Sequence, residues 1–373
     1  MGKKIKKILA SLALILLVPS LFACSSGAEE VTLNDFLGAP VTIVFSSTQS
    51  VVARQNLISK LNDTLDDIES KLSVEDKNSD VYKFNQLDIG EIEVSKLTYD
   101  VFGYCEQIYE ATGGTFNIAN YMLVDLWGFS SRHQKTTYSP IYPYDRAKNS
   151  DNSFGLPEEK YITAFKALAD FSSIESKASG NKYYLVKNCK PQFIDGEKYT
   201  QKLDFPGMAK GYALDECQKL IDESGLSGTY ISFGGSSLYL ADNNGDTFEL
   251  GIVNPFDKFR NSFAKTNVRD KFISTSGVYE NGYTLNGRLY HHIIDTSIGE
   301  PCNNDIVSVT IIGLDGKLSD AYSTAAVVMG KDRAIDFLAS NACTYVIVDK
   351  EKNVYTNSLD LNVYNLEFTV AND

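Results

Sequence analysis

The sequence has little histidine and no sign of a cysteine-based metal site. Only three histidines occur among 373 residues, and two of them, His291 and His292, are adjacent. Structural and catalytic zinc sites draw on several histidines or on closely spaced cysteines. No Cys-x-x-Cys pair is present. These absences argue against a zinc enzyme.

Other common signatures are also missing. The chain has no P-loop, no Gly-x-Gly-x-x-Gly fingerprint and no internal repeat, which argues against the P-loop, Rossmann and solenoid classes. Of six cysteines, one falls in an export signal discussed below. The other five are widely spaced and are interpreted as small buried hydrophobes, with one disulfide left open. They are Cys105, Cys189, Cys217, Cys302 and Cys343.

Basic residues are outnumbered, with 35 Lys and Arg against 48 Asp and Glu, giving a formal charge of −13. Residues 1–23 carry four lysines and no acid, so their removal takes the charge to −17. Such a chain is a poor candidate for binding nucleic acid or an anionic lipid surface.

Only the N-terminus has a long apolar run. Four lysines precede the run Ile8–Phe22, which leads into Leu21-Phe-Ala-Cys24. This pattern predicts a lipoprotein signal peptide over residues 1–23, a lipidated Cys24 and a tether over 24–35. The alternative is an ordinary signal peptide with a chance cysteine. With the first interpretation, the protein is lipid-anchored at the outer face of the cytoplasmic membrane or in the periplasm.

The remaining chain, residues 36–373, is predicted to be one large α+β domain, a largely antiparallel sheet layered with helices. Asn244-Gly245 and Asn286-Gly287 are hairpin signals. Arg132–Phe154 has no periodicity and is interpreted as a surface excursion. The predicted helices are 57–72, 97–111, 157–171, 320–329 and 333–339. The predicted strands are 41–46, 183–186, 192–194, 230–240, 248–253, 306–312 and 345–349.

Two elements suggest metal-assisted phosphate chemistry. In Asp204-Phe-Pro-Gly-Met-Ala-Lys-Gly-Tyr-Ala-Leu-Asp215, an acid precedes a Gly-containing turn and a helix that carries Lys210, a setting that can hold phosphate groups. Far downstream, Asp320 and Thr324 share one helix face and offer hard oxygen ligands suited to Mg²⁺. On spacing alone, a structural interpretation is favoured, in which Ser319 caps the helix and Asp320 complements its dipole.

The histidine pair can supply one base. Side chains alternate along a strand, so only one of His291 and His292 can face a given site, and the other is packed or on the surface. Imidazole accepts a proton near neutral pH. His133 is given no role. Phe233-Gly-Gly-Ser-Ser237 and Thr275-Ser-Gly277 are weak signals for close backbone approach to a ligand.

Eight short blocks follow one another along the chain. They are Leu72-Ser-Val-Glu-Asp-Lys-Asn-Ser-Asp-Val-Tyr-Lys-Phe-Asn85, Thr112-Gly-Gly-Thr-Phe-Asn117, Leu123-Val-Asp-Leu-Trp-Gly-Phe129, Asp204–Asp215, Gly234-Gly235, Thr275-Ser-Gly277, His292-Ile-Ile-Asp295 and Asp320-Ala-Tyr-Ser-Thr324. In this order, the blocks resemble the FAD:protein FMN transferase (ApbE) family over Gly38–Thr356. The first block has serine and asparagine at the family's positions, Ser79 and Asn85.

The resemblance implies an activity and a site. FAD would be the substrate and Mg²⁺ the cofactor; FMN would pass to a hydroxyl of an exported acceptor protein with a [Ser/Thr]-Gly-Ala-[Ser/Thr]-like motif, and AMP would leave. His292 would be the base or would position the acceptor hydroxyl. The implied metal ligands are the Gly207 carbonyl, Asp320 and Thr324, with Ser323 adjacent. The implied FAD-binding residues are Asn117, Asp204, Lys210, Gly234, Ser276, Gly277, Ile294 and Asp295.

Several positions depart from the family pattern. Leu37-Gly-Ala replaces Met-Gly-Thr, Glu75 replaces a tyrosine, and Asn117, Ser236 and Thr296 replace two aspartates and a proline. Because these positions are expected FAD contacts, FAD affinity or acceptor choice is expected to differ. Two alternatives stay open, an FAD pyrophosphatase and a non-enzymatic flavin-binding surface lipoprotein.

Overall fold

The computed structural model describes residues 28–46, 49–130, 156–242, 244–313 and 315–371. The predicted signal peptide, Cys24 and the first residues of the tether, up to residue 27, lie outside the described residues, as does the whole of the predicted excursion over 132–154. Within the described ranges, no helix is both long enough and apolar enough to cross a bilayer.

The helices begin and end where the local sequence dictates. Ser50 caps α1 by accepting from the Ala53 N–H, and the buried stripe of α1 repeats at helical spacing from Leu57 to Leu72. Helix α7 has Pro206 in its first turn and ends at Gly225 in the left-handed conformation. The helices are α1 (Val51–Leu72), α2 (Asp80–Gln86), α3 (Lys96–Ala111), α4 (Tyr121–Leu126), α6 (Glu159–Leu168), α7 (Pro206–Ser224), α8 (Gly316–Met329) and α9 (Lys331–Ser340), with a 3₁₀ turn at Phe171–Ser173.

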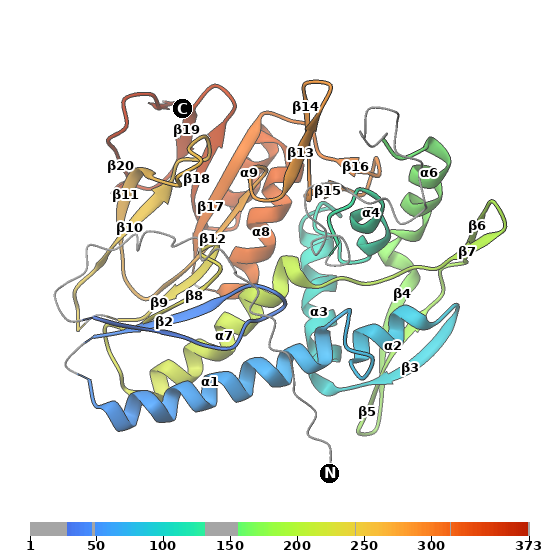
Figure 1. Cartoon of the computed structure of the whole chain (residues 1–373), viewed down its shortest axis with the longest axis horizontal. Helices are drawn as coiled ribbons and strands as arrows, with labels where there is room; N and C mark the ends of the chain where they lie inside the picture. Colours follow the sequence, from blue (N-terminus) through green and yellow to red (C-terminus); the bar gives the residue numbers. More distant parts are fainter. Residues whose placement is uncertain (1–27, 47–48, 131–155, 243, 314, 372–373) are drawn as a thin grey trace, which may run out of the picture.

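The main sheet has the strand order β1-β2-β8-β9-β12-β17-β18-β19-β21 (Figure 1). Every neighbouring pair is antiparallel except β19 and β21. Its strands are β1 (Glu29–Thr32), β2 (Val41–Phe45), β8 (Tyr230–Phe233), β9 (Ser237–Leu240), β12 (Lys271–Gly277), β17 (Ile306–Gly313), β18 (Thr344–Asp349), β19 (Asn353–Thr356) and β21 (Thr369–Val370).

Smaller sheets flank this sheet. They are β10-β11-β20 (Phe248–Val253, Ser262–Val268, Asn362–Val363), β3-β5-β4 (Gly90–Val94, Lys182–Lys187, Ile174–Ser179), β6-β7 (Gln192–Ile194, Glu197–Tyr199), β13-β14 (Gly282–Leu285, Arg288–His291) and β15-β16 (Ile294–Asp295, Glu300–Pro301).

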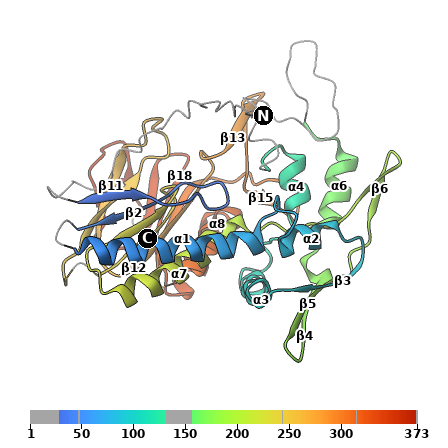
Figure 2. The same cartoon turned by 60° about the horizontal axis from the view of Figure 1, so that its bottom comes forward.

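Alternating side chains give the main sheet two buried faces. On β12, Phe272 joins the core beneath helices α1, α7 and α8, whereas Ile273 joins a second core shared with β10 and β11. Helix α8 packs on β12 and β17, and α1 packs on α7. Figure 2 shows α1 running along the sheet toward α2, where a third cluster gathers around α4 and α6. The predicted α+β class and its largely antiparallel sheet are confirmed.

Three local predictions were wrong. The predicted strand 230–240 is two strands, because Gly234 (φ 59°) and Gly235 (φ 75°) turn the chain between β8 and β9. Asn244-Gly245 does not close a hairpin, since β9 and β10 lie in different sheets. Helix α8 begins at Gly316 and is capped by Asp315, so Ser319 is not its cap. The Asn286-Gly287 hairpin, joining β13 and β14, is confirmed.

The five described cysteines are free thiols, which answers the disulfide question for this structure. Four are buried, as expected of small hydrophobes, and Cys343 is partly exposed.

Candidate active site

A cavity of about 820 Å³ lies where α7, α8, β12 and the segment around α4 meet. Segments from across the chain line it, from Leu37 to Thr324. It is lined by ten residues singled out from the sequence, namely Asn117, Asp204, Gly207, Lys210, Ser276, Gly277, His292, Ile294, Asp320 and Thr324. Three others, Gly234, Asp295 and Ser323, are not part of the lining.

Two glycines allow α7 and α8 to cross at very short range. A Cβ at Gly211 would lie 2.2 Å from the Gly316 carbonyl oxygen and 2.7 Å from Asp320 Cβ. A Cβ at Gly316 would lie 2.4 Å from the Gly211 carbonyl oxygen. Asp215 of α7 also accepts the Gly316 N–H at 2.6 Å, which fixes the start of α8. The crossing therefore brings the Asp204–Asp215 motif against Asp320.

Asp320 is a buried carboxylate, 5% exposed. Its Oδ1 accepts from the Ser237 hydroxyl at 3.0 Å and its Oδ2 from the Gly211 N–H at 3.1 Å. In a regular helix the Gly211 N–H would donate to the Gly207 carbonyl, so Asp320 competes for that donor. Burial raises the pKa of Asp320, opposed by the charge of Lys210.

The hydroxyls beside Asp320 form a connected group. Ser276 Oγ lies 2.8 Å from Ser323 Oγ and 2.9 Å from Thr324 Oγ1. Ser323 is fully buried and donates to the Asp320 carbonyl at 2.9 Å. The Ser276 hydroxyl thus ties β12 to the α8 face that carries Asp320 and Thr324.

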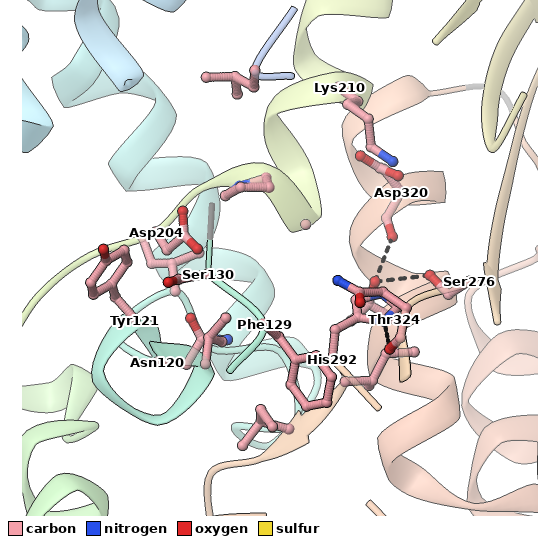
Figure 3. Close-up of a pocket in the computed structure, with 18 of the residues that line it drawn as sticks. Asn120, Tyr121, Phe129, Ser130, Asp204, Lys210, Ser276, His292, Asp320 and Thr324 are labelled. Atoms are coloured by element: carbon pink, nitrogen blue, oxygen red, sulfur yellow. Dashed lines mark hydrogen bonds between the residues drawn. The ribbon is translucent and has the colours of Figure 1, made fainter. Parts of the chain in front are cut away.

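Lys210 reaches the same region from α7 (Figure 3). Its ammonium donates to Ser236 Oγ at 2.9 Å, in the turn between β8 and β9. In Figure 3, Asp204, Tyr121 and Asn120 lie on the opposite side of the cavity from Lys210, Asp320 and Thr324.

Asp204 is held by its neighbours rather than by a salt bridge. Its N–H donates to the Ile118 carbonyl at 2.8 Å. One residue earlier, Leu203 exchanges two hydrogen bonds with the side chain of Asn85, at 2.7 and 2.9 Å. Burial raises the pKa of Asp204 to about 7, opposed by a hydrogen bond from the Phe205 N–H.

The two histidines face different surroundings, as the strand alternation predicts. His292 lines the cavity, and its Nδ1 lies 3.2 Å from the Asn281 carbonyl, which selects the tautomer with Nδ1 protonated and Nε2 free to accept. Burial lowers its pKa, as does Lys210. His291 is buried, 2.9 Å from the Cys302 carbonyl, and burial lowers its pKa to about 4.

The cavity has an excess of negative charge. Its described lining contains five carboxylates, Glu69, Glu75, Asp204, Glu280 and Asp320, against one cationic side chain, Lys210. Ionised carboxylates there would repel a pyrophosphate, and an additional cation would offset that repulsion. No three His, Cys, Asp or Glu side chains of the described residues are grouped as a metal site. A cation here would need hydroxyl or main-chain oxygens, such as those of Thr324 and Gly207, beside Asp320.

A model of the ApbE family matches residues 37–347 of this chain. The chain belongs to the ApbE family. The FAD:protein FMN transferase of Escherichia coli (strain K12) is 27% identical over 295 residues, 78% of this chain and 76% of the relative. That of Vibrio cholerae is 25% identical over 345 residues, 92% and 93%. Both relatives are transferases by name.

Solved ApbE structures share the fold. The ApbE protein from Thermotoga maritima superposes with a TM-score of 0.70 at 25% identity, covering 87% of this chain and 94% of that one. Flavin Transferase ApbE from Vibrio cholerae gives 0.69 at 23% identity, covering 89% and 98%.

The departures from the ApbE pattern gather at the cavity. Leu37, Glu75, Asn117 and Ser236 line it, and Thr296 accepts from Asn117 Nδ2 at 3.2 Å. Asn117 also donates to the Ala169 carbonyl at 2.8 Å and accepts from the Ala119 N–H. An aspartate at position 117 would place a carboxylate oxygen against the Ala169 carbonyl, and the two acceptors would repel each other. The asparagine amide donates a hydrogen bond there instead.

All three residues outside the lining have partners in the fold, and those of Ser323 are given above. The carboxylate of Asp295 accepts from the N–H and hydroxyl of Ser297, at 2.9 and 2.6 Å. The Gly234 N–H donates to the Pro40 carbonyl at 2.8 Å, which joins the β8–β9 turn to the start of β2.

Six polar or charged cavity residues were not singled out from the sequence, namely Glu69, Asn120, Tyr121, Ser130, Glu280 and Asn281. Glu69 is at the end of α1, and Tyr121 is in α4; Glu280 and Asn281 follow β12. Glu69 is a charged residue next to the apolar stripe of its helix, and the sequence does not distinguish it from a solvent-exposed helix position. The sequence holds no short-range signal for it, whereas Glu280 and Asn281 are close to the Thr275-Ser-Gly277 block.

Proposed function

We propose that this protein is a magnesium-dependent FAD:protein FMN transferase. FMN is transferred from FAD to a serine or threonine hydroxyl of an exported acceptor protein, and AMP is released. A new P–O bond forms to the acceptor oxygen as the pyrophosphate P–O bond to AMP breaks. The observation that carries the proposal is that Gly207, Lys210, His292, Asp320 and Thr324, from distant segments of an ApbE chain, line one cavity.

The donor set fits a hard cation. Asp320, the Thr324 hydroxyl and the Gly207 carbonyl are oxygen ligands of the kind that Mg²⁺ accepts together with substrate phosphate and water. Bound Mg²⁺ would neutralise negative charge on the pyrophosphate as AMP leaves. Ser237 and the Gly211 N–H orient the Asp320 carboxylate through the contacts described above.

The other side chains have roles that follow from their surroundings. Lys210 supplies the positive charge of the lining and is held toward the cavity by Ser236. Because the Asn281 carbonyl holds Nδ1 of His292, Nε2 is free to accept the proton of the acceptor hydroxyl. A depressed pKa keeps this imidazole neutral near pH 7. Catalysis would then come mainly from positioning and charge stabilisation.

The test is transfer of flavin to protein. Purified protein is incubated with FAD, Mg²⁺ and a carrier protein bearing a Thr-Gly-Ala-Thr segment, and covalent flavin is followed by in-gel fluorescence. We expect labelled acceptor, lost on chelation of Mg²⁺. Asp320→Asn should lower the rate by roughly 100-fold or more while the protein stays folded, since an amide can keep both contacts of Asp320. No labelling of several such acceptors would refute the proposal.

A second candidate is FAD pyrophosphatase activity, favoured by one observation. Glu75, where the family pattern has a tyrosine, lines the cavity and replaces an aromatic surface with a carboxylate. Weaker retention of the flavin ring would favour attack by water. Free FMN and AMP formed without acceptor, faster than any transfer, would support this alternative, whereas saturable binding of FAD without turnover would indicate a binding protein.

We also propose that the protein is anchored outside the cytoplasmic membrane through lipid on Cys24. The support is the sequence Leu21-Phe-Ala-Cys24 after a lysine-rich start and an apolar run. Labelling with a radioactive fatty acid should mark the wild-type protein and not Cys24→Ser. Equal labelling of both proteins would show that Cys24 is not the lipidated residue.

A further inference from the structure

A partly exposed ion pair lies next to the candidate base. The guanidinium of Arg260 contacts both carboxylate oxygens of Glu280, with Nη1 3.3 Å from Oε1 and Nη2 3.1 Å from Oε2. Glu280 lines the cavity and precedes Asn281, whose carbonyl accepts from both the N–H and Nδ1 of His292. Arg260 itself is not in the lining.

Arg260 is presented by a strained, internally bonded loop. The loop joins β10 to β11, and Arg260 has a φ of 56°, in the left-handed region that non-glycine residues seldom adopt. Asp257 holds this conformation by accepting from the Phe259 N–H at 2.9 Å and the Asn261 amide at 2.6 Å. A loop built this way directs one side chain toward one partner.

The receiving segment, Gly277–Asn281, is held at both ends by strand pairing, since Gly277 pairs with Ser308 and Gly282, which follows it, pairs with His291. The Val278 N–H donates to the Val307 carbonyl at 3.0 Å, and the Glu280 N–H lies 3.4 Å from the Gly277 carbonyl. Tyr279 packs beneath the Arg260 guanidinium, 6.0 Å from ring centroid to Cζ. Between these ends, the two-pronged contact of Arg260 with Glu280 is a side-chain restraint on the residue next to the Asn281 carbonyl.

We propose that Arg260 is a positioning residue for His292, acting through Glu280 and the Asn281 carbonyl. This inference rests on the proposed function in so far as His292 takes up the acceptor proton. The ion pair has a second consequence. The Glu280 carboxylate favours the protonated imidazole of His292, and the guanidinium of Arg260, paired with that carboxylate, would offset part of its charge. Lys210, from α7, lowers the pKa of the same ring, and Asp204 and Asp320 line the cavity beyond it.

The Arg260–Glu280 ion pair is a poor candidate for stabilising the fold. Both side chains are partly exposed, 42% for Arg260 and 30% for Glu280. Exposed pairs add little to folding stability. A positioning role therefore predicts large kinetic effects with little change in Tm, the reverse of a purely structural role.

The test compares Arg260→Gln, Glu280→Gln and the double variant with a matched control. Lys265→Gln breaks another exposed pair, with Glu249 at 2.8 Å, on the same β10–β11 hairpin. We expect each site variant to lower kcat roughly 10-fold at unchanged Tm, the double variant to be no worse than either single one, and the control to match wild type. Additive losses, or losses that follow Tm, would overturn the proposal.

The pH profile separates charge from position. Arg260→Gln leaves the Glu280 charge unbalanced, so the acid limb of kcat/KM should move to higher pH; Glu280→Gln removes that charge, so the limb should move to lower pH. Shifts in the same direction, or none, would contradict the inference. If Arg260→Gln does not fold, Arg260→Lys provides the test, because an ammonium keeps the charge without the two-pronged contact.

A readout without turnover keeps this inference separable from the proposed function. The chain has three histidines, so the imidazole C–H signals can be titrated by NMR and His292 assigned by its absence in His292→Asn. Opposite shifts of the His292 titration in the two variants would support the ion-pair link even if no flavin transfer were found. Unchanged titration in both would refute it.

Discussion

At the scale of residues, the site depends on polar groups held in buried positions by a small number of contacts. The Asp320 carboxylate accepts from the Ser237 hydroxyl and the Gly211 N–H. Asp204 is positioned by the bond from its N–H to the Ile118 carbonyl and by the Asn85–Leu203 bonds next to it. Such groups reduce the stability of the folded chain because burial disfavours their charged forms. A bound cation or ligand, as proposed above, would offset that cost.

Asp204 gives a prediction about pH and stability. Its folded pKa of about 7 is above the unfolded value, so the stability it contributes is present at low pH and lost as pH rises toward 7. Asp204→Asn should therefore raise Tm, by roughly 2–4 °C at pH 8, and by less at pH 5. Thermal unfolding across this pH range measures the difference.

The control for this prediction is the exposed Asp246. Asp246→Asn should leave Tm unchanged at both pH values. A Tm gain for Asp204→Asn that does not grow with pH would show that burial does not govern this carboxyl.

At the scale of elements, the crossing of α7 and α8 assembles the site. Gly211→Ala places a methyl group 2.2 Å from the Gly316 carbonyl oxygen, so the helices must separate. We expect a loss of roughly 1–3 kcal/mol of stability and a larger loss of activity, because Lys210 and Asp320 move apart. Denaturant unfolding and the transfer assay measure the two effects.

Gly103 is the matched control, because it is inside helix α3 and a Cβ there would meet nothing within 4 Å. Gly103→Ala should be neutral or stabilising by up to about 1 kcal/mol. If Gly211→Ala behaves as Gly103→Ala does, the close crossing does not hold the site together.

The sequence predicted long periodic elements well and local chain reversals poorly. The apolar stripe from Leu57 to Leu72 predicts most of α1, because the helical spacing of these residues marks the face that is buried. The turn at Gly234 was not predicted, because the segments on its two sides, 230–233 and 237–240, together have the pattern of one extended strand. Asn244-Gly245 failed as a hairpin signal because turn chemistry fixes only the local bend, and the choice of strand partner is made by the core.

At the scale of the whole molecule, one cavity is built from segments almost three hundred positions apart, from Leu37 to Thr324. The ordered blocks predicted most of its lining, because each keeps its own local chemistry. Glu69 and Arg260 lacked such a signal, since their importance arises from neighbours that only the fold provides. The same assembly left Asp295 outside the lining, with its carboxylate bonded to Ser297.

The most direct measurement counts the products of a single reaction. With FAD, Mg²⁺ and excess acceptor, AMP released and FMN bound to protein are quantified together by chromatography and mass spectrometry. The proposed function predicts equal amounts of AMP and protein-bound FMN, and neither product with Asp320→Asn. AMP accompanied by free FMN, with no flavin on the acceptor, would contradict transfer to a protein hydroxyl.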